Sequence, residues 1–240
     1  MWIDDLIFKN CEQPLVAAIW VPDGVWVVGG NSNDLQRECH IEQCIQDGVS
    51  LLKRCGGGGT VVLHPGCVVV SVGLWVKSFY RNDFYFKQLN ASLINVLKEI
   101  DPKFADVYQD GISDLVFAGK KIAGTSLFRS RNYLLYQASI LVDAKIDLID
   151  KYLAHPSKEP SYRQGKPHDK FLSCLSEHAT GLESGAVKTA YQISFLEHVK
   201  CLLEDEMIPP QEEQILYLKK KVSTDERASG EQIVGGSEIS

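Results

Sequence analysis

Four consecutive glycines, residues 56–59, lie between a basic pair, Lys53-Arg54, and a β-branched run, residues 60–63. Glycine has no Cβ, so this backbone can adopt positive φ and can be approached closely by a ligand. The β-branched run predicts a buried strand that follows the loop. Such a loop beside an arginine suits a carboxylate, an acyl chain or a phosphate. It is not a P-loop, because no Gly-Lys-Ser/Thr follows; a flexible hairpin turn is the alternative interpretation.

A second informative segment comprises residues 114–126. It predicts a strand, a tight turn at Gly119 and a second strand that starts near Lys121. Residues 136–143 predict a further strand. A lysine at the start of a strand can follow developing negative charge on a phosphoryl or carbonyl oxygen, although a surface lysine after a turn is the plainer interpretation.

These segments resemble the lipoate-protein ligase A and octanoyltransferase family, which shares its catalytic fold with biotin-protein ligases. The family pattern Arg-x-Ser-Gly-Gly-Gly-Thr-Val is similar to residues 54–61, and the pattern Asp-Leu-x(5)-Lys-Ile-x-Gly is similar to residues 114–124. Upstream, residues 26–33 followed by Glu38 resemble the family's strand-Gly-x-x-x-Asn…Glu segment. Order and spacing agree from about residue 3 to about residue 180.

The chain departs from the family at four places. Gly56 replaces the usual serine, and Gly30 replaces an arginine. Leu63-His64 stands where His-Asp is expected, and Gln137-Ala138-Ser139 replaces His-Gly-Thr, which removes a histidine often found at the ligand. These departures leave the acyl group, and activity itself, open.

The resemblance implies a set of site residues. Lys121 would touch the carboxylate of lipoate and the α-phosphate of ATP, neutralising charge as the acyl-adenylate forms. Arg54 would contact the carboxylate or phosphate, or form only a salt bridge at the rim. The other substrate- or ATP-binding candidates are Gly57, Gly58, Gly59, Thr60, Asp114, Gly124 and Ser139. Asp114 would hold Mg²⁺ or fix the Lys121 turn, and ATP and Mg²⁺ are the implied cofactors.

The resemblance also implies partners. These are lipoic or octanoic acid and lipoyl carrier domains, namely the E2 subunits of 2-oxo-acid dehydrogenases and the H protein of the glycine cleavage system. Bacterial ligases of this family often carry a C-terminal accessory domain, but only residues 186–222 are available here. Either the two helices expected there suffice, or a separate accessory subunit supplies the rest, or the adenylation reaction is impaired.

Composition excludes other functions. The net charge of −6 disfavours a nucleic-acid-binding surface. The longest apolar run, residues 67–75, is too short for a membrane span of about 20 residues. No basic segment precedes an apolar stretch at the N-terminus, so we expect no signal peptide. Seven scattered cysteines without Cys-x-x-Cys pairs predict neither zinc nor disulfides and indicate the reducing cytoplasm.

The order of elements predicts an α+β fold with a mixed, mostly antiparallel sheet and packed helices. Strands are expected at residues 15–20, 25–28, 50–52, 60–63 and 68–72, and helices at 34–47, 83–100, 143–153, 186–203 and 211–222. Pro22-Asp23-Gly24 predicts a hairpin between the first two strands. Residues 157–169 are expected to form an exposed, mobile loop. The predicted organisation is a catalytic domain at 1–185, a helical appendage at 186–222 and a disordered tail at 223–240.

Two other functions remain open. An octanoyltransferase would need a reactive cysteine, but Pro156-Ser157-Lys158 and residues 101–112 contain none where two classes of transferase carry theirs. Cys174 is the remaining nearby thiol, and its apolar neighbours suggest packing. The other alternative is a catalytically impaired relative that only binds an acyl ligand or a carrier domain.

Overall fold

The structure is a computed structural model that describes residues 3–229. It contains a six-stranded sheet in the order β1-β5-β9-β8-β7-β6 and a three-stranded sheet in the order β3-β2-β4. All pairs in the large sheet are antiparallel, and β2 pairs in parallel with β3. The strands are β1 (Leu15–Trp20), β2 (Trp26–Gly29), β3 (Ser50–Lys53), β4 (Val61–Leu63), β5 (Cys67–Trp75), β6 (Tyr108–Asp110), β7 (Asp114–Phe117), β8 (Lys120–Ser130) and β9 (Tyr133–Leu141). The predicted α+β class with a mostly antiparallel sheet is confirmed.

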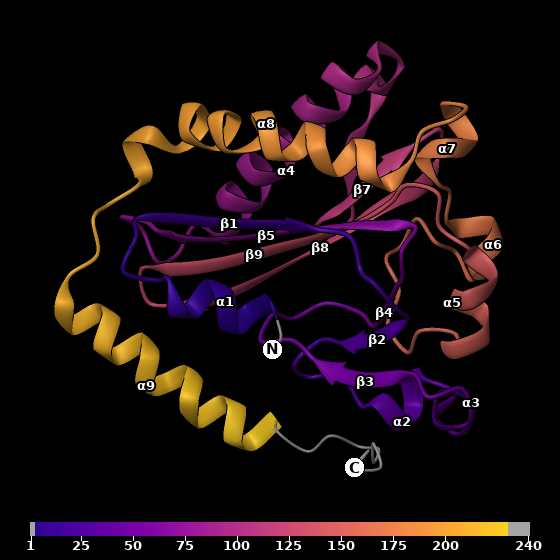
Figure 1. The fold of residues 1–240 in the computed structure, drawn as a ribbon, viewed down its shortest axis with the longest axis horizontal. Helices are drawn as coiled ribbons and strands as arrows, with labels where there is room; N and C mark the ends of the chain where they lie inside the picture. Colours follow the sequence, from indigo (N-terminus) through magenta and orange to yellow (C-terminus); the bar gives the residue numbers. More distant parts are fainter. Residues whose placement is uncertain (1–2, 230–240) are drawn as a thin grey trace.

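Helices cover both faces of the large sheet (Figure 1). The α-helices are α1 (Ile3–Lys9), α2 (Leu35–Glu38), α3 (Ile41–Gln46), α4 (Asn82–Ile100), α5 (Ile146–Tyr152), α6 (His168–Phe171), α7 (Leu175–His178), α8 (Ser184–Leu203) and α9 (Glu212–Ser229), and the 3-10 helices are η1 (Pro102–Asp106) and η2 (Glu204–Glu206). Helices α4 and α8 lie on one side of the large sheet, whereas α1, α9 and the small sheet lie on the other. No helix within residues 3–229 is long and apolar enough to cross a membrane.

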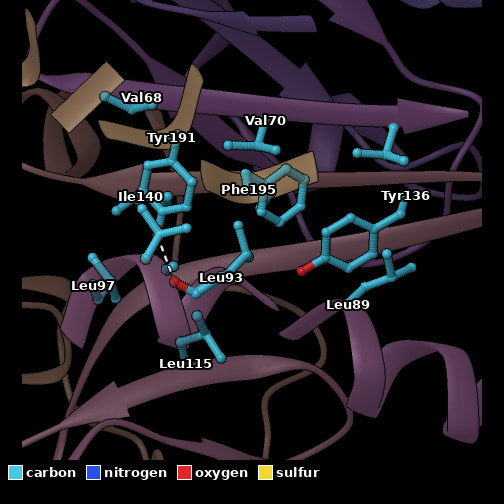
Figure 2. Close-up of a cluster of buried hydrophobic side chains, with 14 of the residues drawn as sticks. Val68, Val70, Leu89, Leu93, Leu97, Leu115, Tyr136, Ile140, Tyr191 and Phe195 are labelled. Carbon is cyan, nitrogen blue, oxygen red and sulfur yellow. Dashed lines mark hydrogen bonds between the residues drawn. The ribbon is translucent and has the colours of Figure 1, made fainter. Parts of the chain in front are cut away.

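The main core lies between the large sheet and the helices α4 and α8. Strand residues alternate toward it, so Val68, Val70 and Tyr136 all point to the same side. Figure 2 shows Tyr191 and Phe195 of α8 packed among strand side chains and leucines of α4. The Tyr191 hydroxyl donates to the carbonyl of Leu93 at 3.0 Å, which satisfies a polar group in an otherwise apolar interior.

Helix α8 contributes to this core along its whole length. Val187, Tyr191, Phe195, Val199 and Leu203 recur every four residues and are all buried. The predicted domain boundary between residues 185 and 186 falls near the start of α8, but α8 belongs to the same core as the strands. Helix α9 continues to Ser229, beyond its predicted end at residue 222, and the remaining predicted tail lies outside the described residues.

Two sequence-based predictions of local structure were wrong. The first two strands do not form a hairpin, because β1 pairs with β5 over six positions and β2 belongs to the small sheet. The Pro22-Asp23-Gly24 turn instead carries the chain from one sheet to the other. The helix predicted at 34–47 is interrupted, because Cys39 is extended and bridges to Leu153, and the amide of His40 donates to Tyr152.

Candidate active site

Lys121 lies at the start of β8, as predicted, and its ammonium group is paired with a carboxylate. The Lys121 Nζ lies 2.8 Å from Asp114 Oδ1, and the two side chains are 23% and 15% exposed. Gly124 leaves room for this arrangement, since a Cβ there would come within 3.1 Å of Lys121 Nζ. Ser139 is the cross-strand partner of Gly124. Four predicted site residues therefore meet on adjacent strands.

The Arg54 side chain holds the glycine loop in shape. Its Nη2 donates to the carbonyls of Gly57 and Gly59 at 2.7 and 2.8 Å, and its Nη1 donates to Val28 at 3.3 Å. Burial lowers the pKa of Arg54 to about 10, so the guanidinium is still protonated at neutral pH. Arg54 therefore donates to the loop backbone, and its contact with a ligand stays a prediction.

The four glycines of the loop have different environments. A Cβ at Gly56 would lie 3.1 Å from Ser126 Oγ. Gly58 has a φ of +93°, and a Cβ added there would lie 3.0 Å from Arg54 Nη2. Gly57 and Gly59 face open space, with nothing within 4 Å of an added Cβ. The absence of neighbours at Gly57 and Gly59 leaves the backbone approachable from that side.

The two motifs meet in space although they are far apart in sequence. Gly56 and Gly58 lie against Ser126 and Thr125 of β8, immediately after Gly124. Thr60 ends the loop, and its hydroxyl hydrogen-bonds with the side chain of Asn33 at 3.1 Å. The glycine loop, the Asn33 turn and the Lys121 strand therefore form one continuous region.

An apolar row leads away from the charged end of this region. Gly124 pairs with Ser139, Ser139 with Val69, and Val69 with Trp20, so these residues lie side by side across β8, β9, β5 and β1. Directly paired residues share one face of a sheet. Trp20 packs against Trp26 of the small sheet, with ring centroids 5.3 Å apart. The row runs from an ammonium group to an aromatic pair, and Val69 within it is buried with Val28 and Leu63 of the small sheet.

Several residues at the site were missed by the sequence analysis. Tyr162 donates to Asp114 Oδ2 at 2.8 Å, and the amide of Ser173 donates to the carbonyl of Lys121 at 3.0 Å. Asp4 accepts from Gln137 Nε2 at 2.6 Å and from the Cys55 amide at 3.4 Å, which ties the glycine loop to the sheet. No periodic or motif signal marks these residues. The only clue to Tyr162 was an aromatic residue within a polar segment.

The segment at 157–169, predicted to be an exposed loop, is partly buried. Arg163 is 5% exposed, and its guanidinium lies 4.7 Å from the ring centroid of Phe171. Glu38 is buried and accepts hydrogen bonds from the amide and hydroxyl of Ser157. Glu38 therefore fixes the start of this segment, which passes beside Asp114 through Tyr162.

Cys174 has the properties of a packing residue. Its side chain is buried, its Sγ donates to the carbonyl of Ala144 at 3.1 Å, and burial raises the pKa of the thiol to about 12. A catalytic thiol needs an accessible thiolate at neutral pH. These observations disfavour an acyl-enzyme intermediate on Cys174.

Metal binding by protein side chains alone is not favoured. Among residues 3–229, no group of three or more His, Cys, Asp or Glu side chains is arranged to hold a metal ion. The two carboxylate oxygens of Asp114 are engaged by Lys121 and Tyr162. Both oxygens of the predicted Mg²⁺ ligand therefore already have protein partners.

A protein-family model and several curated proteins match the part of the chain that contains this site. The family model described as "Lipoyl protein ligase A/B catalytic domain" matches residues 1–196. "Probable lipoate-protein ligase A" of Mycoplasma pneumoniae is 27% identical over 146 residues, covering 61% of this chain and 42% of that protein. "Inactive lipoate–protein ligase 2" of Plasmodium falciparum is 23% identical over 180 residues, covering 62% and 47%. The chain spans less than half the length of these curated relatives.

Solved structures share the fold. A bi-partite lipoate protein ligase from Thermoplasma acidophilum, described with its E2 lipoyl domain, superposes with a TM-score of 0.69 at 18% identity. That match covers 98% of this chain and 92% of the other. A lipoate-protein ligase A bound with ATP superposes with a TM-score of 0.67 at 18% identity, covering 95% and 91%.

Proposed function

The chain belongs to the lipoyl protein ligase A/B catalytic-domain family, and from this premise we propose that it is the catalytic unit of a lipoate-protein ligase. The observation that carries the proposal is the row from Lys121 through Gly124, Ser139 and Val69 to the tryptophan pair, beside the glycine loop. It would place a cation beside the carboxylate of the ligand and apolar side chains of both sheets beside its acyl chain. The fold shared with an ATP-bound lipoate ligase supports ATP as the second substrate.

The proposed reaction has two steps. A carboxylate oxygen of lipoate or octanoate forms a bond to the α-phosphorus of ATP while the bond to the bridging oxygen of pyrophosphate breaks. The amine of a carrier lysine then attacks the acyl carbon, the carbon–oxygen bond to AMP breaks, and the amine loses a proton to solvent. Lys121 would neutralise charge in both steps, while the loop orients the acyl-adenylate.

Mg²⁺ would enter with the nucleotide rather than bind to a preformed protein site. Mg²⁺ in nucleotide-binding sites is commonly held by substrate phosphates and one or two carboxylates. Because both oxygens of Asp114 are engaged, we assign this residue first to orienting Lys121. No step of the proposed reaction depends on a protein-bound metal.

The proposed partners are a lipoyl carrier domain and an accessory subunit. The relative from Thermoplasma acidophilum is a bi-partite ligase described with an E2 lipoyl domain. The bi-partite organisation of that relative supports an accessory subunit as a proposed partner of this chain, which spans less than half of its curated relatives. The free cysteines fit the cytoplasm as the expected compartment.

A catalytically impaired acyl- or carrier-binding protein is the second candidate function. One relative is named inactive. In addition, Gln137 occupies the place where the family often has a histidine at the ligand, and its Nε2 is engaged by Asp4. This alternative predicts ligand binding without pyrophosphate release.

Pyrophosphate release from ATP, measured with lipoate, octanoate and biotin in turn, tests the proposal. A ligase should release pyrophosphate with lipoate or octanoate, and acylated carrier should appear when a lipoyl domain is added. The assay is run with this chain alone and again with the proposed accessory subunit added. Absence of release under both conditions, together with measurable lipoate binding, would favour the impaired relative.

Lys121→Ala and Lys120→Ala provide a matched pair for this assay. Lys121 lies beside Asp114, whereas Lys120 Nζ reaches the carbonyl of Asp169 at a longer 3.5 Å. We expect Lys121→Ala to abolish acyl transfer in a folded protein and Lys120→Ala to be almost silent. Equal activity of the Lys121 variant and the parent would exclude the proposed role.

A further inference from the structure

Tyr162 and Lys121 bind opposite oxygens of one carboxylate. The Tyr162 hydroxyl donates to Asp114 Oδ2 at 2.8 Å, and Lys121 Nζ lies 2.8 Å from Asp114 Oδ1. Both contacts are short, and the Asp114 side chain is only 15% exposed. Burial and the neighbouring Asp114 raise the pKa of Tyr162, so its hydroxyl remains protonated and acts as the donor.

The Tyr162 ring is held in place without help from its hydroxyl. It packs against Phe171, with ring centroids 5.1 Å apart. On another side it lies against Gly111, where a Cβ would come within 3.5 Å of the Tyr162 Cε1 atom. Removal of the hydroxyl alone should therefore leave the ring, and the segment that carries it, in position.

A carboxylate bound through one oxygen can rotate about its last side-chain bond. A second donor on the other oxygen fixes the plane of the carboxylate and so the direction in which the first oxygen points. We propose that Tyr162 is a positioning residue for Lys121 that acts through Asp114. The inference rests on the proposed function of Lys121, and it gives the segment after α5 a direct part in the site.

The chain contains a second lysine–aspartate–tyrosine group that serves as a control. Tyr152 donates to Asp47 Oδ2 at 3.0 Å, and Lys151 Nζ lies 2.7 Å from the same oxygen. This group links α5 to the end of α3 and contains none of the residues of the candidate site. Tyr152→Phe therefore deletes the same kind of hydrogen bond as Tyr162→Phe at a different place.

The first measurement follows Lys121 directly and does not require enzymatic activity. The full chain, without ligand, is treated briefly with an amine-reactive reagent, and modification of Lys121 and Lys120 is quantified by peptide mass spectrometry. In Tyr162→Phe we expect Lys121 to be modified about two- to tenfold faster, the range set by loss of one hydrogen bond. Lys120 should be unchanged, and Tyr152→Phe should match the parent at both lysines.

Three results would overturn the proposal. An unchanged Lys121 rate would show that the hydroxyl does not restrain Asp114. A slower rate would show that it draws Asp114 away from Lys121. A parallel increase at Lys120 would indicate general loosening of the strand.

The second measurement tests whether the Tyr162 hydroxyl positions Lys121 or instead contributes to substrate binding. If pyrophosphate release is present in the parent, Tyr162→Phe should lower kcat and kcat/KM together by about two- to tenfold, with KM for ATP unchanged, because the lost contact acts on the transition state. A change confined to KM would contradict the positioning role. If the parent releases no pyrophosphate, the proposed function fails while the labelling result still decides the role of Tyr162.

Discussion

Neighbouring glycines in the loop at 56–59 are under different conformational constraints. Gly58 has a φ of +93°, a conformation that side chains of L-residues rarely adopt, and its Cβ position is close to Arg54. Gly57 has neither a positive φ nor a neighbour within 4 Å of an added Cβ. Nothing in the described protein therefore demands glycine at position 57, so this position can test whether a ligand lies against the loop backbone.

Gly57→Ala should weaken ligand binding and leave stability almost unchanged. The added methyl group meets no protein atom, but it occupies the side from which a ligand would approach. Calorimetric titration with a non-hydrolysable acyl-adenylate mimic, run beside thermal unfolding, measures both quantities. We expect at least a tenfold loss of affinity, equivalent to about 1.4 kcal/mol, with Tm within a degree or two of the parent.

Gly185→Ala is the control for this substitution. Gly185 lies in the first turn of α8, and its added Cβ also meets nothing within 4 Å. Alanine in a helix is favoured over glycine by up to about 1 kcal/mol, so this variant should be slightly stabilised with unaltered binding. Unaltered affinity in Gly57→Ala would mean that position 57 is only part of a turn.

The loop and the strand beside it form a unit that is joined through one buried arginine. Arg54 donates to Val28 on β2 and to Gly57 and Gly59 in the loop. A planar guanidinium with several fixed donors can satisfy these carbonyls at once, whereas an ammonium group cannot match the same geometry. Arg54 thus holds the loop in a conformation that the positive φ of Gly58 allows.

Arg54→Lys should lower stability and also loosen the loop. Loss of the guanidinium donors removes a hydrogen bond to the buried Val28 carbonyl and two to partly buried loop carbonyls, which costs roughly 1–3 kcal/mol. Denaturant unfolding would measure this loss, and hydrogen exchange of the amides at 56–60 would report faster opening of the loop. The control is Arg37→Lys on α2, an exposed position where we expect no change. If the Arg54→Lys protein is less stable but its amides at 56–60 exchange hydrogen as slowly as in the parent, Arg54 does not hold the loop closed.

The molecule as a whole is organised around one core that includes α8. Phe195 is fully buried, whereas Ile193, two residues earlier on the same helix, is 72% exposed. Helix α9 is bound on the opposite side of the sheet, where Leu218 and Val222 pack with Phe8 and Trp75. The C-terminal helices therefore cover both faces of the sheet.

Phe195→Ala should destabilise the whole protein. Removal of a fully buried phenylalanine side chain typically costs about 3–5 kcal/mol, because apolar contacts are lost and a cavity remains. Ile193→Ala is the matched control and should change the unfolding free energy by less than about 0.5 kcal/mol. The unfolding transition in Phe195→Ala should remain single and cooperative; separate unfolding of α8 at a lower temperature would instead support an independent appendage.

Local sequence patterns were sufficient for most strands and long helices. Residues 15–20 and the helix beginning near residue 83 were placed almost correctly, because apolar periodicity reports which face of an element is buried. The same patterns misjudged the hairpin after β1, since a turn signal fixes where the chain bends and not which strand it pairs with next. The helix at 34–47 was interrupted by pairing with residues beyond 150, a contact that no local pattern contains.

The candidate site also combines features that local sequence predicts with contacts that only the folded chain produces. Lys121, Asp114 and the glycine loop became candidates through the resemblance of their motifs to a family pattern, and local sequence predicted only the strands and turns that carry them. The contacts that orient them could not be read in this way. Tyr162 reaches Asp114, and Arg54 reaches the carbonyl of Val28, only because folding places distant segments together. Short-range patterns encode which elements form, whereas hydrogen bonds between distant elements depend on the packing of the complete chain.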